Sequence, residues 1–267
     1  MTGGETGGEG DEAGAGAAGD VAGVLADMSR RLDDLPPGRA GWGAFLATYR
    51  RTTAAVDEAI RSGFFEDGAW VQRWDVVFAR HYLDAHDAAL SDGEVPRPWR
   101  LAFDADPELP PLRRVLLGIN AHVNFDLPQA LVEVIDAADF DDPALMARRR
   151  RDHERIDAVL AARVGAEDRR LDPGPLTERL LAPLNRLASR RFLREARLKV
   201  WHNTCELHAA RLEGPQAYRT RLAELSLLSA ARIADLLEPG QVLLRLAVAG
   251  FGVTLPPALP PPGRLET

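Results

Sequence analysis

Four polar side chains alternate along an otherwise apolar stretch, LLGINAHVNFDLPQAL (residues 116–131): Asn120, His122, Asn124 and Asp126. Residues four apart share a helix face, so this spacing predicts that His122 contacts Asp126 and that Asn120 lies beside Asn124. A histidine and an aspartate in apolar surroundings both need partners, and such groups are often functional when they cluster. All four residues are therefore candidate catalytic residues, with His122 and Asp126 as an acid/base pair or as metal ligands.

Pro128 interrupts the helix that would carry these side chains. It has no N–H to give to the carbonyl of Asn124, and it disfavours helical angles at Leu127. Two geometries remain open: a helix kinked between residues 124 and 128, or a helix that ends near Phe125 and restarts with Asp126 as its N-cap. Both free backbone groups that the asparagines and His122 could satisfy, so a purely structural role for the segment also stays open.

Three further side chains could complete a metal site. Asp152 opens an apolar helical row, so its carboxylate should point toward the core and could meet His122. His202 and Glu206 lie four apart on another predicted helix, where a surface ion pair is the alternative. The predicted ligands are His122, Asp126, Asp152, His202 and Glu206. Nitrogen and oxygen ligands of this kind suit zinc, iron or manganese, and water activated on such a metal would favour hydrolysis.

The elements that must position these residues are helices. Apolar residues recur at steps of three and four, and sustained period-two alternation is absent. The predicted helices cover residues 21–28, 45–60, 70–81, 111–137, 143–166, 175–212 and 215–237, with a short one after Pro239. We therefore expect an all-α protein, a single-domain multi-helix bundle.

The composition changes at both ends of the chain. Residues 1–20 form an acidic Gly/Ala-rich head, and residues 251–267 form a Pro-rich tail; neither can bury much apolar surface, so both are expected to be disordered. The helical domain is predicted to span residues 21–250.

Charge and composition exclude several classes of protein. The net charge of −7 comes largely from the head, and the nearly neutral body lacks the basic surface of a nucleic-acid binder. No secretory signal or long apolar span is present, and the single cysteine, Cys205, precludes an internal disulfide. We expect a cytoplasmic protein that binds neither nucleic acid nor membranes; its oligomeric state is not indicated. Phosphate loops, Gly-x-Ser-x-Gly elbows and His-Glu-x-x-His motifs are absent.

Four segments together resemble a known family: GINAHVNFDLP, FARHYLDAHDAALSDGEVPRPWRLAF, RRDHERIDAVL and REARLKVWHN. Over roughly residues 40–235 the chain is similar to an actinobacterial domain-of-unknown-function family, number 5995. The resemblance implies a helical fold with His122, Asn124 and Asp126 as its signature and a second element at Asp152. It implies no reaction.

Three functions stay open. The first is a small-molecule enzyme whose buried His/Asn/Asp pocket works through a metal or through acid/base chemistry. The second is a protein that binds a small ligand or partner in the same pocket without turnover. The third gives the motif a structural role only. We place the enzyme first, with a small molecule as its substrate.

Overall fold

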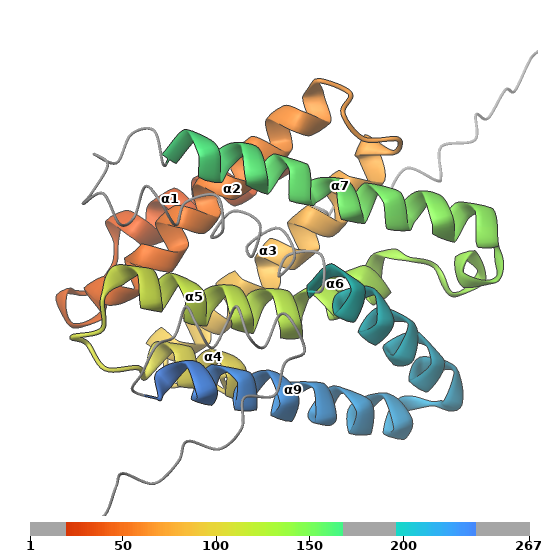
Figure 1. Cartoon of the computed structure of the whole chain (residues 1–267). Helices are drawn as coiled ribbons and strands as arrows, with labels where there is room; N and C mark the ends of the chain where they lie inside the picture. The colour runs from red at the N-terminus through yellow and green to blue at the C-terminus, as the bar shows by residue number, and fades with distance from the viewer. Residues whose placement is uncertain (1–19, 168–195, 239–267) are drawn as a thin grey trace, which may run out of the picture.

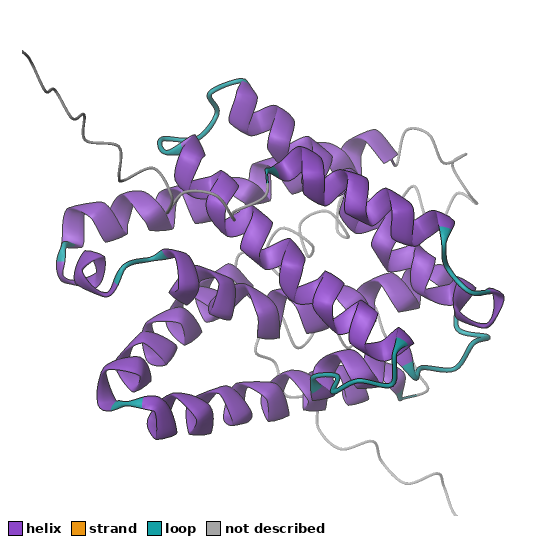
Figure 2. Cartoon of the chain, turned by 180° about the vertical axis from the view of Figure 1, so that it is seen from behind, coloured by secondary structure: helices purple, strands orange, loops and turns teal. Residues whose placement is uncertain are grey.

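The computed structural model describes residues 20–167 and 196–238. Within these ranges the chain forms α-helices, short 3-10 turns and one π-helical turn, and no strand is present (Figure 2). The predicted all-α class is therefore confirmed. Residues 1–19, 168–195 and 239–267 lie outside the described part of the chain, and so do the predictions made for them.

Within each of the two described ranges, short connections join successive helices (Figure 1). In chain order they are α1 (Val21–Asp33), η1 (Pro37–Trp42), α2 (Gly43–Arg61), α3 (Gly68–Leu90), α4 (Arg97–Phe103), α5 (Pro111–Ala121), η2 (His122–Asp126), α6 (Leu127–Val134), η3 (Ala137–Asp141), α7 (Pro143–Glu167), a helix over residues 196–213, and α9 (Pro215–Leu237). Neither η1 nor α4 was predicted, because both are short and lie among prolines and glycines.

The first helix corrects one predicted boundary. The Asp20 side chain accepts a hydrogen bond of 2.7 Å from the backbone N–H of Gly23, and its backbone is extended. This is the geometry of an N-cap. Asp20, which we assigned to the acidic head, therefore belongs to the helical domain.

Helix α3 is the centre of the bundle. It packs against α1, α2 and α6, and it lies in the middle of the ribbon in Figure 1. Trp70, Trp74 and Tyr82 of α3 are among the largest fully buried side chains of the described residues. Asp67 begins the helix by accepting a hydrogen bond from the N–H of Trp70. The core is thus built around one aromatic-rich helix, and the site described below lies against it.

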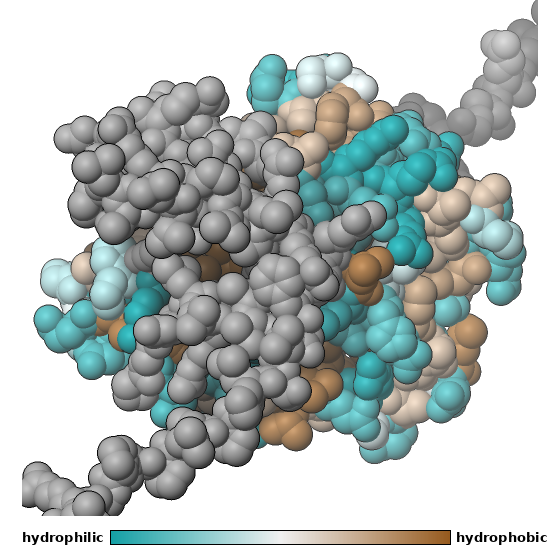
Figure 3. Space-filling model, viewed as in Figure 1, coloured by the Kyte–Doolittle hydropathy of each residue, from teal (hydrophilic) through white to brown (hydrophobic). Residues whose placement is uncertain are grey.

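The surface of α7 is charged and paired. Figure 3 shows hydrophilic residues over the part of α7 that this view leaves uncovered. Arg151 donates two hydrogen bonds of 2.9 Å to the Glu66 carboxylate, and Arg150 pairs with Glu154 one turn along.

Within residues 20–167 and 196–238, no helix combines the length and the apolar character needed to cross a membrane.

Helices α2 and α5 approach closely at Gly118. A Cβ atom added there would meet the ring atoms of Phe45 closer than real contacts allow. The ring cannot easily give way, because it packs against Tyr82, Trp99 and His122 at centroid distances of 5.0, 5.4 and 5.9 Å. The position of α5, and of the π turn that follows it, therefore depends on the absence of a side chain at residue 118.

Gly118→Ala should consequently destabilise the protein. Alanine in a helix interior gains about 1 kcal/mol over glycine, whereas overpacking a fixed core costs about 1–3 kcal/mol, so we expect a net loss in the free energy of unfolding. Gly68→Ala is the matched control, since its Cβ would meet Ile60 at an ordinary 3.4 Å. Urea unfolding measures both, and a Gly118→Ala variant as stable as Gly68→Ala would contradict this packing.

Candidate functional site

A π-helical turn joins α5 to α6 and carries the polar residues of the motif. The Leu127 N–H donates to the carbonyl of His122, five residues back, while the backbone of Asp126 stays helical at φ −78° and ψ −39°. The chain is thus neither broken nor restarted here, and Asp126 makes no capping hydrogen bond. Of the two geometries left open by the sequence, the restart with Asp126 as N-cap is therefore excluded. A wider turn gives the Pro128 ring room beside the carbonyl of Asn124, which a regular α-helix would not.

His122 and Asp126 form a buried pair. Nδ1 of His122 lies 2.8 Å from Oδ2 of Asp126, which confirms the contact predicted from their spacing. The indole Nε1–H of Trp99, on α4, donates to the same oxygen at 2.8 Å. His122 is 2% exposed and Asp126 1%. A carboxylate can only accept, so Nδ1 of His122 carries the proton and Nε2 carries the lone pair.

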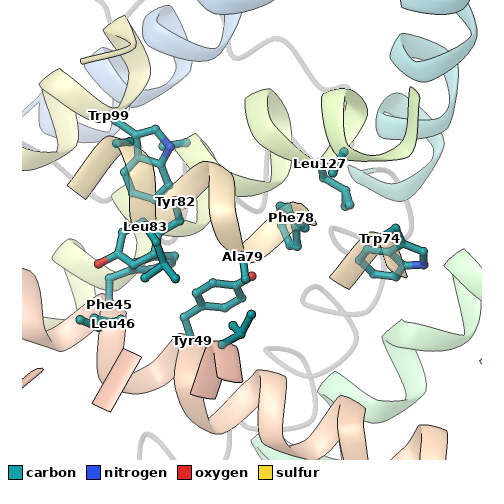
Figure 4. Close-up of a cluster of buried hydrophobic side chains, with 14 of the residues drawn as sticks. Phe45, Leu46, Tyr49, Trp74, Phe78, Ala79, Tyr82, Leu83, Trp99 and Leu127 are labelled. Atoms are coloured by element: carbon teal, nitrogen blue, oxygen red, sulfur yellow. The ribbon is translucent and has the colours of Figure 1, made fainter. Parts of the chain in front are cut away.

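Aromatic rings enclose this imidazole. Phe78 stacks on it at a centroid distance of 3.5 Å and an angle of 6°, and Tyr49 meets it edge to face at 4.4 Å. Figure 4 shows Tyr49, Phe78 and Trp99, from α2, α3 and α4, as members of one cluster of buried side chains. Burial lowers the pKa of His122, and the hydrogen bond to Asp126 opposes that effect only in part. The imidazole is therefore neutral near pH 7, as a general base must be.

A cavity of about 150 Å³ adjoins His122. Side chains of α2, α3, α5, η2, α6, α7 and the helix over residues 196–213 line it, and His122 is part of its wall. Nε2 of His122 is buried and has no hydrogen-bond partner among the described residues. An unpaired buried acceptor beside a cavity is costly for the protein alone, and a bound molecule could pair with it.

Asp75 on α3 is a second polar group of this cavity, and sequence reasoning missed it. Its side chain is 4% exposed, and Oδ2 has no hydrogen-bond partner among the described residues. Burial raises its pKa to about 7, and the charge of Asp57 adds to the rise. A signal was present, because Asp75 lies three and seven positions before Phe78 and Tyr82, on the same buried face.

A family model described as a family of unknown function (DUF5995) matches residues 21–239 of the chain. The chain belongs to this family. No curated protein and no solved structure matches it. Membership in DUF5995 therefore confirms the resemblance, but it brings no reaction, and the site of this DUF5995 protein has to be interpreted from its own geometry.

The two asparagines of the DUF5995 chain also line the cavity. Nδ2 of Asn124 donates to Oδ1 of Asn120 at 3.2 Å, as the spacing predicted, and Nδ2 of Asn120 donates to the carbonyl of Leu116 at 2.8 Å. Both hydrogen bonds run along the helix, and neither involves His122, whose Nδ1 pairs with Asp126. The asparagines thus brace one wall of the cavity, and a catalytic role for either stays a prediction.

Asp152 is fully buried, as predicted, but its partners lie elsewhere. Its two carboxylate oxygens accept hydrogen bonds from the backbone N–H groups of Glu66 (2.8 Å) and Asp67 (2.7 Å), and Arg155 adds an ion pair at 3.1 Å. Asp152 therefore fastens α7 to the start of α3, and it is not part of the cavity wall. The helical row correctly indicated burial but not the partner.

The remaining predicted metal ligands are not gathered with the buried pair. His202 and Glu206 lie on the exposed face of the helix over residues 196–213, whereas His122 and Asp126 are buried. In the part of the chain that the structure describes, no three His, Cys, Asp or Glu side chains are grouped as a metal site requires. Zinc, iron or manganese binding by this DUF5995 protein stays a prediction, without a ligand set among these residues.

Proposed function

We propose that this protein is a small-molecule enzyme in which Nε2 of His122 takes a proton from a substrate bound in the cavity. The observation that carries this proposal is the unpaired Nε2 beside the 150 Å³ cavity, on an imidazole whose other nitrogen is fixed by Asp126. A base oriented by a buried carboxylate is the arrangement that general-base catalysis uses on many folds.

Each member of the pair has a distinct task in this chemistry. Asp126 fixes the tautomer and orientation of His122, and its negative charge would stabilise the imidazolium that forms when Nε2 takes up a proton. Trp99 fixes Asp126 in turn through its indole N–H. Because burial keeps the imidazole neutral near pH 7, the base is ready without prior deprotonation.

The cavity limits the substrate to a small, largely apolar molecule. Its volume is about that of a cavity that admits one benzene-sized ring. Phe45, Tyr49, Trp74 and Phe78 supply much of the wall, so the apolar part of a substrate would be shielded from water. Phe78 and Tyr49 also pack against the imidazole and limit the directions from which a substrate can reach it.

The experiment has two measurements on the full chain. NMR of ring nitrogens in isotope-labelled histidines should show His122 neutral near neutral pH with the proton on Nδ1, its signal being identified by loss in His122→Gln. Benzisoxazole then probes the base: removal of its C–H proton breaks the N–O bond and releases a cyanophenol that absorbs light. We expect His122→Gln to lower this rate by about 100-fold or more, whereas the exposed His202→Gln leaves it unchanged.

Two outcomes would contradict the proposal. A proton on Nε2 of His122 would remove the base, and equal rates for the wild type and His122→Gln would exclude its participation. If benzisoxazole binds in the cavity without reacting, the second candidate is favoured: a protein that binds small ligands without turnover, in which Phe78 and Tyr49 keep the imidazole covered.

A further inference from the structure

The cavity wall presents several polar atoms that have no partner among the described residues. They are Oδ2 of Asp75, the hydroxyls of Tyr49 and Thr53, Nε2 of His122 and Nε1 of Trp74. All but the Trp74 indole can accept a hydrogen bond, and two of them, the carboxylate oxygen and the imidazole lone pair, are pure acceptors when Asp75 is ionised. The wall as a whole therefore matches a ligand rich in hydrogen-bond donors.

The rest of the wall favours a cation. Phe45, Tyr49, Trp74 and Phe78 all line the cavity, and the faces of aromatic rings attract an ammonium group. Trp74 and Phe78 lie one position before and three positions after Asp75 on α3, so the carboxylate and two of these rings come from the same turns of helix. Figure 4 shows Tyr49 from α2 directed toward this part of α3.

Among the described residues that line the cavity, no cationic side chain pairs with Asp75. Arg197 lines the cavity, but its Nε donates to the Asp157 carboxylate at 2.9 Å. The other titratable groups around Asp75 are Asp57 and Tyr49 on α2 and His122 on η2. Of these, Asp57 is itself acidic, Tyr49 is neutral because burial raises the pKa of its phenol, and His122 is neutral, so none of them is a counter-ion for Asp75. Asp75 is thus a buried carboxyl group without a counter-ion among these neighbours.

We propose that the cavity binds a small primary amine, whose ammonium group is bound by the Asp75 carboxylate and whose apolar body lies between the aromatic rings of α2 and α3. This inference rests on the proposed function, because it names the class of substrate that would be presented to His122. The three N–H donors of an ammonium group match Asp75 Oδ2 and the hydroxyls of Tyr49 and Thr53.

Amine binding should be coupled to the loss of one proton from Asp75. When no amine is bound, burial raises the pKa of Asp75 to about 7 and so favours its protonated form at and below neutral pH. An ammonium group requires the carboxylate, so each amine bound would release one proton from the protein at pH values below about 7. The dissociation constant should therefore rise about tenfold per pH unit below that value.

The experiment compares three probes of nearly the same size: benzylamine, benzyl alcohol and toluene. Binding to the full chain is measured by ligand-observed NMR and calorimetry at about pH 6 and about pH 8, where benzylamine stays protonated. We expect benzylamine to bind about tenfold or more tightly than benzyl alcohol at the higher pH and to weaken at the lower one. The affinity of benzyl alcohol should not depend on pH.

Two variants separate Asp75 from the general charge of the protein. Asp75→Asn should weaken benzylamine by about tenfold or more and leave benzyl alcohol within about threefold, because the amide keeps the shape but loses the charge. Asp84→Asn removes an exposed carboxylate of the same helix and should change neither affinity. The pH comparison on the wild type keeps the test valid if Asp75→Asn fails to fold.

The outcomes distinguish the amine proposal from the proposed function. The amine proposal would be overturned if benzyl alcohol or toluene bound as tightly as benzylamine, or if the affinity for benzylamine did not change with pH. Neither result would contradict the proposed role of His122 as a base. Unchanged benzisoxazole rates in His122→Gln, together with normal benzylamine binding, would instead overturn the base and leave the amine site. If none of the three probes binds, the amine proposal falls.

Discussion

Asp126→Ala is expected to lower the free energy of unfolding by about 2–5 kcal/mol, because it leaves two buried donors unpaired at about 1–3 kcal/mol each. The carboxylate accepts two hydrogen bonds, from Nδ1–H of His122 and from Nε1–H of Trp99. Its removal would leave both donors buried without partners and would open a small void between η2 and α4. Urea unfolding followed by far-UV circular dichroism measures the change.

Asp126→Asn serves as the control for shape. Trp99 and His122 share one carboxylate oxygen, so an amide oxygen in that place can still accept from both, and the variant loses mainly the negative charge. We therefore expect a smaller loss of stability than in Asp126→Ala, with the His122 proton still on Nδ1. A loss below about 1 kcal/mol for Asp126→Ala would show that neither donor depends on this carboxylate.

Asp75→Asn should act in the opposite direction and stabilise the protein at alkaline pH. The pKa of Asp75 rises from 3.8 to about 7 in the folded protein because the carboxyl group is buried. Between these values the folded chain keeps a proton that the unfolded chain has released, so the stability of the wild type falls as the pH rises from about 4 to about 7. Above that range the variant should be more stable by on the order of 2–4 kcal/mol.

The measurement is a series of urea unfolding curves across this pH range. Asp84→Asn, which removes an exposed carboxylate from the same helix, is expected to follow the wild type. If the curves of Asp75→Asn and the wild type run parallel from acid to alkaline pH, Asp75 titrates normally and its burial has no energetic consequence. A benzylamine concentration well above its dissociation constant should restore part of the stability that the wild type loses.

Local spacing predicted the part of the site that lies within one helix. The i,i+4 rule placed His122 beside Asp126 and Asn120 beside Asn124, and the π turn preserves both contacts. Trp99 could not be found in this way, because it lies 27 residues from Asp126 on a short helix that follows Pro96. Its contact depends on the path of the chain through the bundle, which periodicity does not describe.

Burial was also easier to predict than partners. The apolar row that begins at Asp152 correctly indicated a buried carboxylate, but the same pattern is compatible with any neighbour in the core. The structure places two backbone N–H groups of the segment before α3 there. Asp75 was missed for the converse reason, since the helix predicted over residues 70–81 was inferred from its apolar residues alone.

The π turn also bears on how this site could have arisen. Such a turn contains one residue more than the α-helical ladder requires, which is what a single-codon insertion into an older regular helix would leave behind. Each residue of a helix adds about 100° of rotation, so the insertion would have turned the faces of α5 and α6 relative to each other by that amount. The extra residue therefore fixes which side chains of α6 face α3. Deleting one residue from the π turn would rotate α6 relative to α5 and would change which of its side chains are buried.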